Sequence, residues 1–190
     1  MMNNWYQLKT VTEKHWSNIN LYKKGVYGFQ IQQGTRWNKG LSIQEIADLE
    51  VLFNIALPLD CKRMLQVMNG FDQDHVDFCG GEDEKRYARS CYKYPDDWST
   101  VQTFIAELYD NIKYIKIALE ESGLAKQDIQ GFIPLYGHRA LVVFEDLRLS
   151  PVISAVGDDV IIYGNTLFEY WINEFRIRGF FMRRIKGRLL

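Results

Sequence analysis

Three segments of this chain begin with a serine or threonine that is followed three residues later by Glu or Gln. In such a capping box the hydroxyl accepts a hydrogen bond from a free first-turn N–H, and the longer side chain reaches back to the cap residue. The three pairs are Ser42–Glu45, Ser99–Gln102 and Thr166–Glu169, and each precedes apolar residues at helical spacing. The pattern therefore predicts three amphipathic helices that bury one face each in a shared interior.

Other helix signals lie near the first of these segments. Leu57–Pro58 forces an extended step, so the helix that begins at Ser42 must end before it. Asp60 is expected to cap a second helix, which Asn69–Gly70 stops. Closer to the N-terminus, apolar spacing predicts a short helix over 12–24 and a strand over 26–31.

In the second half of the chain, one long predicted helix is followed by several short apolar runs. The helix that begins at Ser99 is expected to be one long helix, with apolar residues from Val101 to Leu119 on one face, and to end at Gly123. Phe132–Tyr136 and Leu141–Phe144 are apolar runs bounded by turn residues, which predicts buried strands. Residues 152–163 predict a hairpin around Gly157-Asp158-Asp159. Because helices and strands do not alternate strictly, the order favours an α+β fold with a mixed sheet over a doubly wound fold.

The length and charge of the chain indicate one domain with a basic tail. A chain of 190 residues, 47% hydrophobic and 25% charged, is in the ordinary globular range, and no linker marks a second domain. We assign 1–36 to an N-terminal extension packed on the domain, 37–175 to the domain, and 176–190 to the tail. The tail carries six basic residues and no acid, whereas residues 1–175 carry 17 basic and 24 acidic side chains. An acidic body favours basic partners and disfavours nucleic acid.

The cysteines and the N-terminus indicate a cytoplasmic protein. The chain has an odd number of cysteines, Cys61, Cys79 and Cys91, and no CxxC motif. This usage is typical of reduced thiols in a cytosol. The first ten residues have no basic region followed by an apolar stretch, so no signal peptide is expected. No apolar run approaches the ~20 residues of a membrane span.

Few residues suggest a metal site or catalysis. His75, Cys79 and Cys91 would supply three zinc ligands, but a structural zinc site takes four. Cys79 would serve as a nucleophile only with His75 or His138 as its base, and no known motif surrounds that pairing. The glycine pairs lack the sequence of a phosphate loop, and the acidic stretch lacks the order of a calcium loop. We therefore expect no enzyme activity, no metal, no cofactor and no small-molecule substrate.

Two charged segments are candidates for contact with a partner. One is an acidic stretch with nearby tyrosines, which is either a solvated loop or a docking surface for a basic protein. Its candidate contact residues are Asp72, Asp74, Asp77, Glu82 and Asp83, with Tyr92 and Tyr94 as aromatic anchors. The other is Arg176–Leu190, which either folds back on the domain or grips nucleic acid or an anionic membrane.

The order of several short motifs resembles one known family. The first group opens with Gly40-Leu41-Ser42 and continues through Leu57-Pro58-x-Asp60 to the stretch Leu65–Asp72, and Tyr94-Pro95 precedes the long helix. The second group runs from Ile133–Arg139 through Pro151–Asn165 to Glu174-Phe175. Across Trp37–Phe175 this pattern resembles the SUKH superfamily, which includes bacterial immunity proteins and the Smi/Knr-type regulators of fungal cell-wall synthesis.

The resemblance implies a fold and a class of function. The fold would be α+β, with a curved, mixed and mainly antiparallel sheet flanked by helices. The function would be that of an immunity protein that binds and neutralises a cognate bacterial toxin, without catalytic residues. Two alternatives stay open: a regulatory adaptor in cell-wall or stress signalling, and a nucleic-acid or membrane binder that acts through the basic tail. The sequence does not indicate an oligomeric state.

Overall fold

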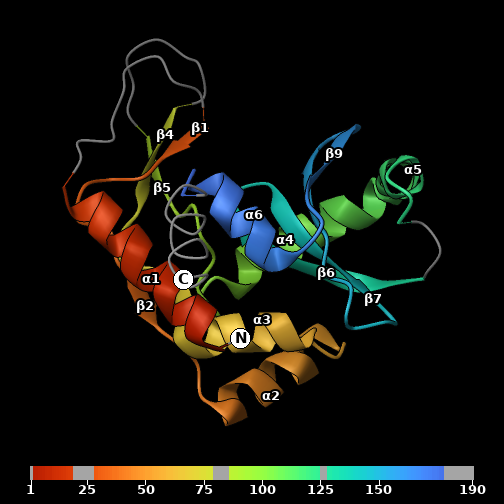
Figure 1. The fold of residues 1–190 in the computed structure, drawn as a ribbon. Coiled ribbons are helices and arrows are strands. Elements are labelled where there is room, and N and C mark those ends of the chain that lie inside the picture. The colour runs from red at the N-terminus through yellow and green to blue at the C-terminus, as the bar shows by residue number, and fades with distance from the viewer. Residues whose placement is uncertain (1, 19–27, 79–85, 125–127, 178–190) are drawn as a thin grey trace, which may run out of the picture.

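The computed structural model describes residues 2–18, 28–78, 86–124 and 128–177, and Figure 1 shows their arrangement. The helices are α1 (Met2–Ser17), α2 (Ile43–Phe53), α3 (Leu59–Val67), α4 (Trp98–Asp110), α5 (Ile112–Glu121) and α6 (Leu167–Glu174). The strands are β1 (Gly28–Gln30), β2 (Trp37–Lys39), β3 (Met68–Phe71), β4 (His75–Phe78), β5 (Arg86–Ala88), β6 (Ile129–Tyr136), β7 (Arg139–Phe144), β8 (Val152–Val156) and β9 (Asp159–Gly164).

The strands confirm the α+β class but divide into three sheets. The sheets have the orders β1-β4-β5, β2-β3 and β6-β7-β8-β9, and every pair among the described strands is antiparallel. The expected mainly antiparallel pairing is confirmed, and the described strands form three sheets where one sheet was expected. Two-residue turns join β6 to β7 and β8 to β9, and connections this short produce antiparallel neighbours. The three-stranded and four-stranded sheets lie on opposite sides of α6 (Figure 1).

The segment after β5 connects the two larger sheets. Cys91 forms an isolated antiparallel bridge with Tyr136 at the end of β6. On either side of it, the Tyr92 N–H donates to the Leu135 carbonyl at 3.2 Å and the Gly137 N–H donates to the Ser90 carbonyl at 2.7 Å. This connection places Tyr92 beside the turn between β6 and β7.

Two of the three predicted hydroxyl caps are confirmed. The Ser42 hydroxyl accepts from the Glu45 N–H at 3.2 Å, and the Glu45 carboxylate accepts from the Ser42 N–H at 2.7 Å, which completes the capping box of α2. The Thr166 hydroxyl accepts from the Glu169 N–H at 3.1 Å at the start of α6. Both caps begin helices that bury one face in the core.

The third capping box is wrong. Helix α4 begins at Trp98 with Asp97 at the N-cap position, so Ser99 lies inside the first turn. The Asp97 carboxylate accepts from the Lys93 N–H at 2.7 Å, and the Val101 N–H donates to the Asp97 carbonyl. The turn before the helix thus fixes its start, and the Ser99 hydroxyl is left on the helix surface.

The expected long helix is two helices, α4 and α5, that meet at Asn111. The Asn111 side-chain amide donates to the Glu107 carbonyl at 2.9 Å, and the Asn111 backbone N–H donates to the same oxygen. Asparagine side chains that bond to nearby backbone compete with helix continuation, which accounts for the break.

The boundaries of α3 also differ from expectation. Pro58, not Asp60, is its N-cap residue, and Asp60 lies in the first turn, where the helix dipole favours a negative charge. The helix ends at Val67, before Asn69–Gly70, because Met68 already pairs with β2 as the first residue of β3.

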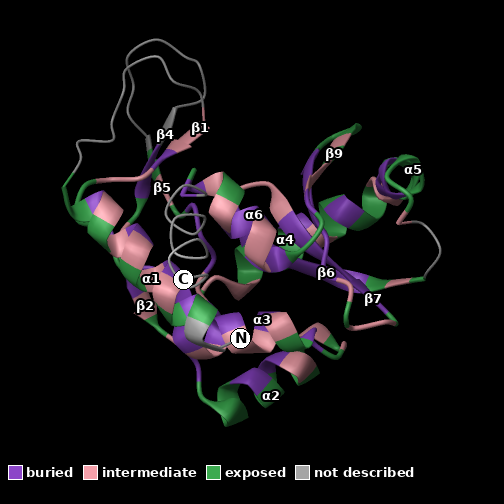
Figure 2. Cartoon of the chain, viewed as in Figure 1, coloured by how far each residue is buried: buried purple, intermediate pink, exposed green. Residues whose placement is uncertain are grey.

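The N-terminal helix contributes to the core. It begins at Met2, well before the expected start at residue 12, and it buries Trp5, Leu8 and Trp16. These side chains belong to the same apolar cluster as the central residues of β6, β7 and α6. Trp16 lies 5.4 Å from Phe71 and 5.0 Å from Phe175 between ring centroids. Figure 2 shows burial concentrated in β6, β7 and α6, with exposed residues on the outer side of α2.

Candidate functional site

A groove of about 620 Å³ lies between α4 and two turns of the four-stranded sheet. Its walls are α4 on one side and the β6–β7 and β8–β9 turns on the other. Volumes of this size are typical of sites that enclose a ligand or a short piece of a partner. The groove is thus the candidate binding site of the described structure.

The α4 wall of the groove is polar. Ser99, Thr103 and Glu107 follow one another at intervals of four residues, so they lie on one face of the helix. All three side chains are exposed, and the Thr103 hydroxyl donates to the Ser99 carbonyl at 3.2 Å. The Glu107 carboxylate has no hydrogen bond or ion pair with any residue that the structure describes. This wall therefore offers a negative charge with no internal partner.

The floor and the opposite wall are apolar side chains and turn backbone. Phe104 and Leu108 from α4 and Ala155 from β8 form the buried floor. The other wall includes Gly137 of the β6–β7 turn and Gly157 of the β8–β9 turn, with φ of 54° and 58°. Glycine adopts this left-handed conformation without strain, so the turns can be tight. The groove thus combines an apolar base with polar edges.

Tyr92 forms part of the groove floor and lies near the charge of Glu107. Its side chain is 9% exposed and lines the groove, and its hydroxyl donates to the Gly137 carbonyl at 2.9 Å. Burial, together with the nearby negative charges of Glu107 and Asp97, raises the pKa of Tyr92 to about 12. The charge of Glu107 is therefore felt at the groove floor.

Two of the predicted acidic contact residues, Asp72 and Asp74, lie outside the groove and are engaged within the protein. The Asp72 carboxylate accepts from the Arg36 N–H at 2.9 Å, and an Asp74 carboxylate oxygen lies 3.5 Å from Nε of Arg89. Asp77 belongs to β4, but its side chain is not among those described. Glu82 and Asp83 lie outside the described residues. Asp72 and Asp74, the two whose side chains are described, do not line the groove.

The two predicted aromatic anchors have different positions. Tyr92 lies in the groove, whereas Tyr94 is 3% exposed and its hydroxyl donates to the Pro134 carbonyl inside the core. The Tyr94 backbone also exchanges two hydrogen bonds with the side chain of Asn69. Burial raises the pKa of Tyr94 well above its ordinary value. Its position is incompatible with an anchor on the surface, so we assign Tyr94 a structural role.

His75 and Cys91, which the sequence suggested as zinc ligands, are both buried. His75 is fully buried, with one ring nitrogen 2.6 Å from the Ser90 hydroxyl and the other 3.2 Å from the Thr35 hydroxyl. Burial lowers the pKa of His75 to about 4 and raises the pKa of the Cys91 thiol. Cys79 lies outside the described residues. Within the described ranges, no three His, Cys, Asp or Glu side chains come together as a metal site.

A buried ion pair joins the end of α6 to the sheet. Nε of Arg139 lies 3.4 Å from a Glu174 carboxylate oxygen, and each side chain is 13% exposed. The Arg139 guanidinium also lies 4.7 Å from the ring centroid of Tyr163 and donates to its hydroxyl at 3.3 Å. Burial raises the pKa of Glu174, and the charge of Arg139 offsets part of that shift. This pair faces inward, so each charge is offset within the protein.

His138, the third histidine, lies in the β6–β7 turn and lines the groove. One of its ring nitrogens lies 3.1 Å from the Arg139 guanidinium.

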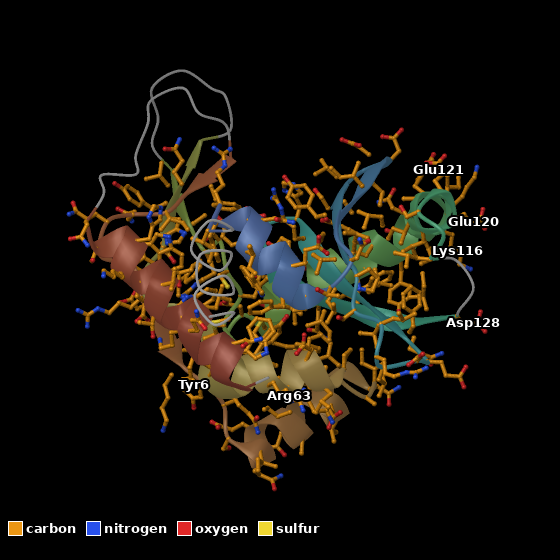
Figure 3. All side chains as sticks on the ribbon, viewed as in Figure 1. Tyr6, Arg63, Lys116, Glu120, Glu121 and Asp128 are labelled. Atoms are coloured by element: carbon orange, nitrogen blue, oxygen red, sulfur yellow. The ribbon has the colours of Figure 1, made fainter. Side chains whose placement is uncertain are left out.

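Arg176 and Ile177 are the only described residues of the basic tail; Arg176 is exposed and Ile177 is buried. Glu120, Glu121 and Asp128 project outward near the far end of α5, away from the groove lining (Figure 3).

The sequence analysis missed the α4 wall. The sequence pattern predicts a capping role for Ser99 and singles out neither Thr103 nor Glu107. The available signal is a polar stripe at intervals of four residues beside the apolar face. Such a stripe occurs on most surface helices, so only the approach of the two turns distinguishes this one.

No protein-family model, no curated protein and no solved structure matches this chain. Among the described helices, none has the length and apolar character needed to cross a bilayer.

Proposed function

We propose that this chain is a non-catalytic protein-binding domain of the immunity type, which neutralises a bacterial toxin by occupying its surface. The observation that carries the proposal is the groove beside α4, where the Glu107 carboxylate, which has no hydrogen bond or ion pair with a described residue, lies beside an apolar floor. The motif resemblance to the SUKH superfamily supports the same class of function. The excess of acidic residues in 1–175 favours a basic partner.

The groove would form the centre of a larger interface. A stable complex buries ~800 Å² on each partner, more than a groove of this size provides. Exposed apolar residues next to it supply further area: Val156 lines the groove and is 58% exposed, and Ile161 on β9 is 49% exposed. A central pocket with an apolar surround is the usual arrangement of a binding hot spot.

The test uses the protein encoded by the neighbouring gene in the source genome. The full chain is mixed with that protein, and binding is measured by calorimetry. Thr103→Trp fills the groove from an exposed helix position, and Gln102→Trp places the same side chain on an exposed position of α4 that does not line it. We expect Thr103→Trp to weaken binding at least about tenfold and Gln102→Trp to leave it within about twofold.

Equal binding by both tryptophan variants would contradict the proposed site. A neighbour protein that neither binds the chain nor is neutralised by it would contradict the immunity role. A neighbour with a role in cell-envelope regulation would favour the adaptor alternative instead.

Asp72 and Asp74 remain a predicted steering surface. We expect simultaneous charge reversal at both positions to slow association with a basic partner at low salt, because long-range attraction raises association rates. Stopped-flow rates at two ionic strengths measure the effect, and rates unchanged at low salt would remove these residues from the interface.

A further inference from the structure

The α4 groove requires an occupant that is apolar along its length and cationic at its end. Its floor is made by the side chains of Phe104, Leu108 and Ala155, which gain from contact with a hydrocarbon stem. Its edge carries the Glu107 carboxylate, which has no cation among the described residues. Arginine and lysine are the side chains that combine these two properties.

The hydrogen-bonding groups around Glu107 favour arginine over lysine. The hydroxyls of Ser99 and Thr100 line the groove and have no side-chain hydrogen bond within the described part of the chain. The Asn111 amide nitrogen is engaged with the Glu107 carbonyl, which leaves the amide oxygen as an acceptor. A guanidinium has five N–H donors in a flat fork, whereas an ammonium has three around one point. Several acceptors along one wall suit the fork.

Glu107 is the one acidic side chain among the described residues that line the groove. Its negative charge acts on Tyr92 at the floor, whereas Asp97, which also acts on Tyr92, lies outside the lining and near Arg89. The Arg139 guanidinium contacts His138 at 3.1 Å, but Arg139 itself does not line the groove, and its charge is shared with Glu174 and the Tyr163 hydroxyl. His138 is the only other titratable side chain of the opposite wall among the described residues.

We propose that the groove receives an arginine side chain of the partner protein, with the guanidinium paired to Glu107 and the stem lying on Phe104 and Leu108. This inference rests on the proposed function, since it specifies what the binding groove recognises. Charge-assisted hydrogen bonds of a guanidinium to a carboxylate are among the stronger polar contacts in proteins.

The test is a titration of the isotopically labelled full chain at neutral pH, followed by amide chemical shifts. The probe is the capped tripeptide acetyl-Gly-Arg-Gly-amide, compared with the same peptide carrying lysine and with one carrying citrulline, the neutral isostere of arginine. We expect saturable shifts at Thr103, Glu107 and Gly137, with affinity decreasing from arginine to lysine to citrulline.

Glu107→Gln tests the role of the carboxylate, and Asp110→Asn is the matched control. Asp110 is exposed on the same helix and does not line the groove, so its variant removes an equal charge nearby. We expect Glu107→Gln to weaken the arginine peptide about tenfold or more, to the level of the citrulline peptide, and Asp110→Asn to change it by less than about twofold. Equal affinity for arginine and citrulline, or an unchanged affinity in Glu107→Gln, would overturn the inference.

The same variants separate this inference from the proposed function. A partner that loses affinity for Thr103→Trp but binds Glu107→Gln as tightly as the original chain would contradict the arginine assignment and leave the binding groove standing. An arginine peptide that binds through Glu107, together with a neighbour protein that does not bind at all, would support the arginine site and contradict the immunity role.

Discussion

The groove beside α4 and the polar interior around β4 and β7 both contain polar and charged side chains. Those in the interior are buried and paired, whereas the carboxylate in the groove is exposed. In the interior, His75 lies between two hydroxyls, and Arg139 faces Glu174. In the groove, Glu107 faces solvent with no partner among the described residues. A buried polar group is tolerated only when it is paired, whereas an exposed one remains available to another molecule. The comparison therefore separates residues that stabilise the fold from a residue that is free to bind.

The largest expected effect is on the buried ion pair. Arg139→Met leaves the Glu174 carboxylate buried without its cation, which we expect to lower the free energy of unfolding by about 3–5 kcal/mol. Denaturant unfolding followed by circular dichroism measures the change. Arg148→Met, which removes an exposed guanidinium paired to Asp146, is the matched control and should leave stability unchanged. Equal losses of unfolding free energy in Arg139→Met and Arg148→Met would contradict the distinction between the buried and the exposed ion pair.

The second expected effect is a dependence of stability on pH through His75. The folded protein holds His75 neutral, with a pKa of about 4, whereas the unfolded chain has the ordinary value of 6.5. Its stabilising contribution is therefore complete above pH 6.5 and declines as the pH falls toward 4, by roughly 3 kcal/mol in all.

Comparison of unfolding curves between pH 7 and pH 4 for the original chain and for His75→Gln isolates this contribution, because the other titrating groups are common to both. We expect a shallower decline in His75→Gln than in the original chain. Parallel curves for the original chain and His75→Gln would show that His75 is not held neutral by burial.

A smaller effect is expected at Asp72, which belongs to the predicted acidic surface but bonds within the protein. Asp72→Asn weakens the acceptor for the Arg36 N–H and should lower stability by about 1 kcal/mol. Asp96→Asn, which changes an exposed carboxylate paired only to Lys93, serves as the control. If Asp72→Asn leaves the unfolding midpoint unchanged, the contact with Arg36 contributes nothing, and the carboxylate is as available to a partner as that of Glu107.

The smallest effect on stability is expected at Glu107. Because its carboxylate contacts no described residue, Glu107→Gln should leave the thermal unfolding midpoint where it is. A clear loss of stability in this variant would mean that the carboxylate has an internal role, and it would remove the contrast with the interior.

The sequence allowed the local elements to be predicted well where the signal lies within a few residues. The Ser42–Glu45 capping box and the β8–β9 hairpin around Gly157 are examples, since each depends on neighbours in the chain. The break at Asn111 was missed because a helical pattern of apolar residues continues through it, and only the bond from its side chain to the Glu107 carbonyl reveals the competition.

The groove could not be predicted from the sequence, for a different reason. Its walls come from α4, the β6–β7 turn and the β8–β9 turn, which the fold brings together from three parts of the chain. The predicted acidic surface was chosen from adjacent residues, and adjacency does not reveal that Asp72 bonds Arg36 or that Asp74 approaches Arg89. A site that depends on tertiary packing requires the structure.

The most direct test of the account is a hydrogen–deuterium exchange footprint of the full chain in complex with the protein encoded by the neighbouring gene. We predict slower exchange along α4 and in the β6–β7 and β8–β9 turns, with the segment around Asp72 and Asp74 little changed. Protection confined to residues 72–78, with α4 exchanging as in the unbound protein, would contradict the assignment of the groove as the binding site.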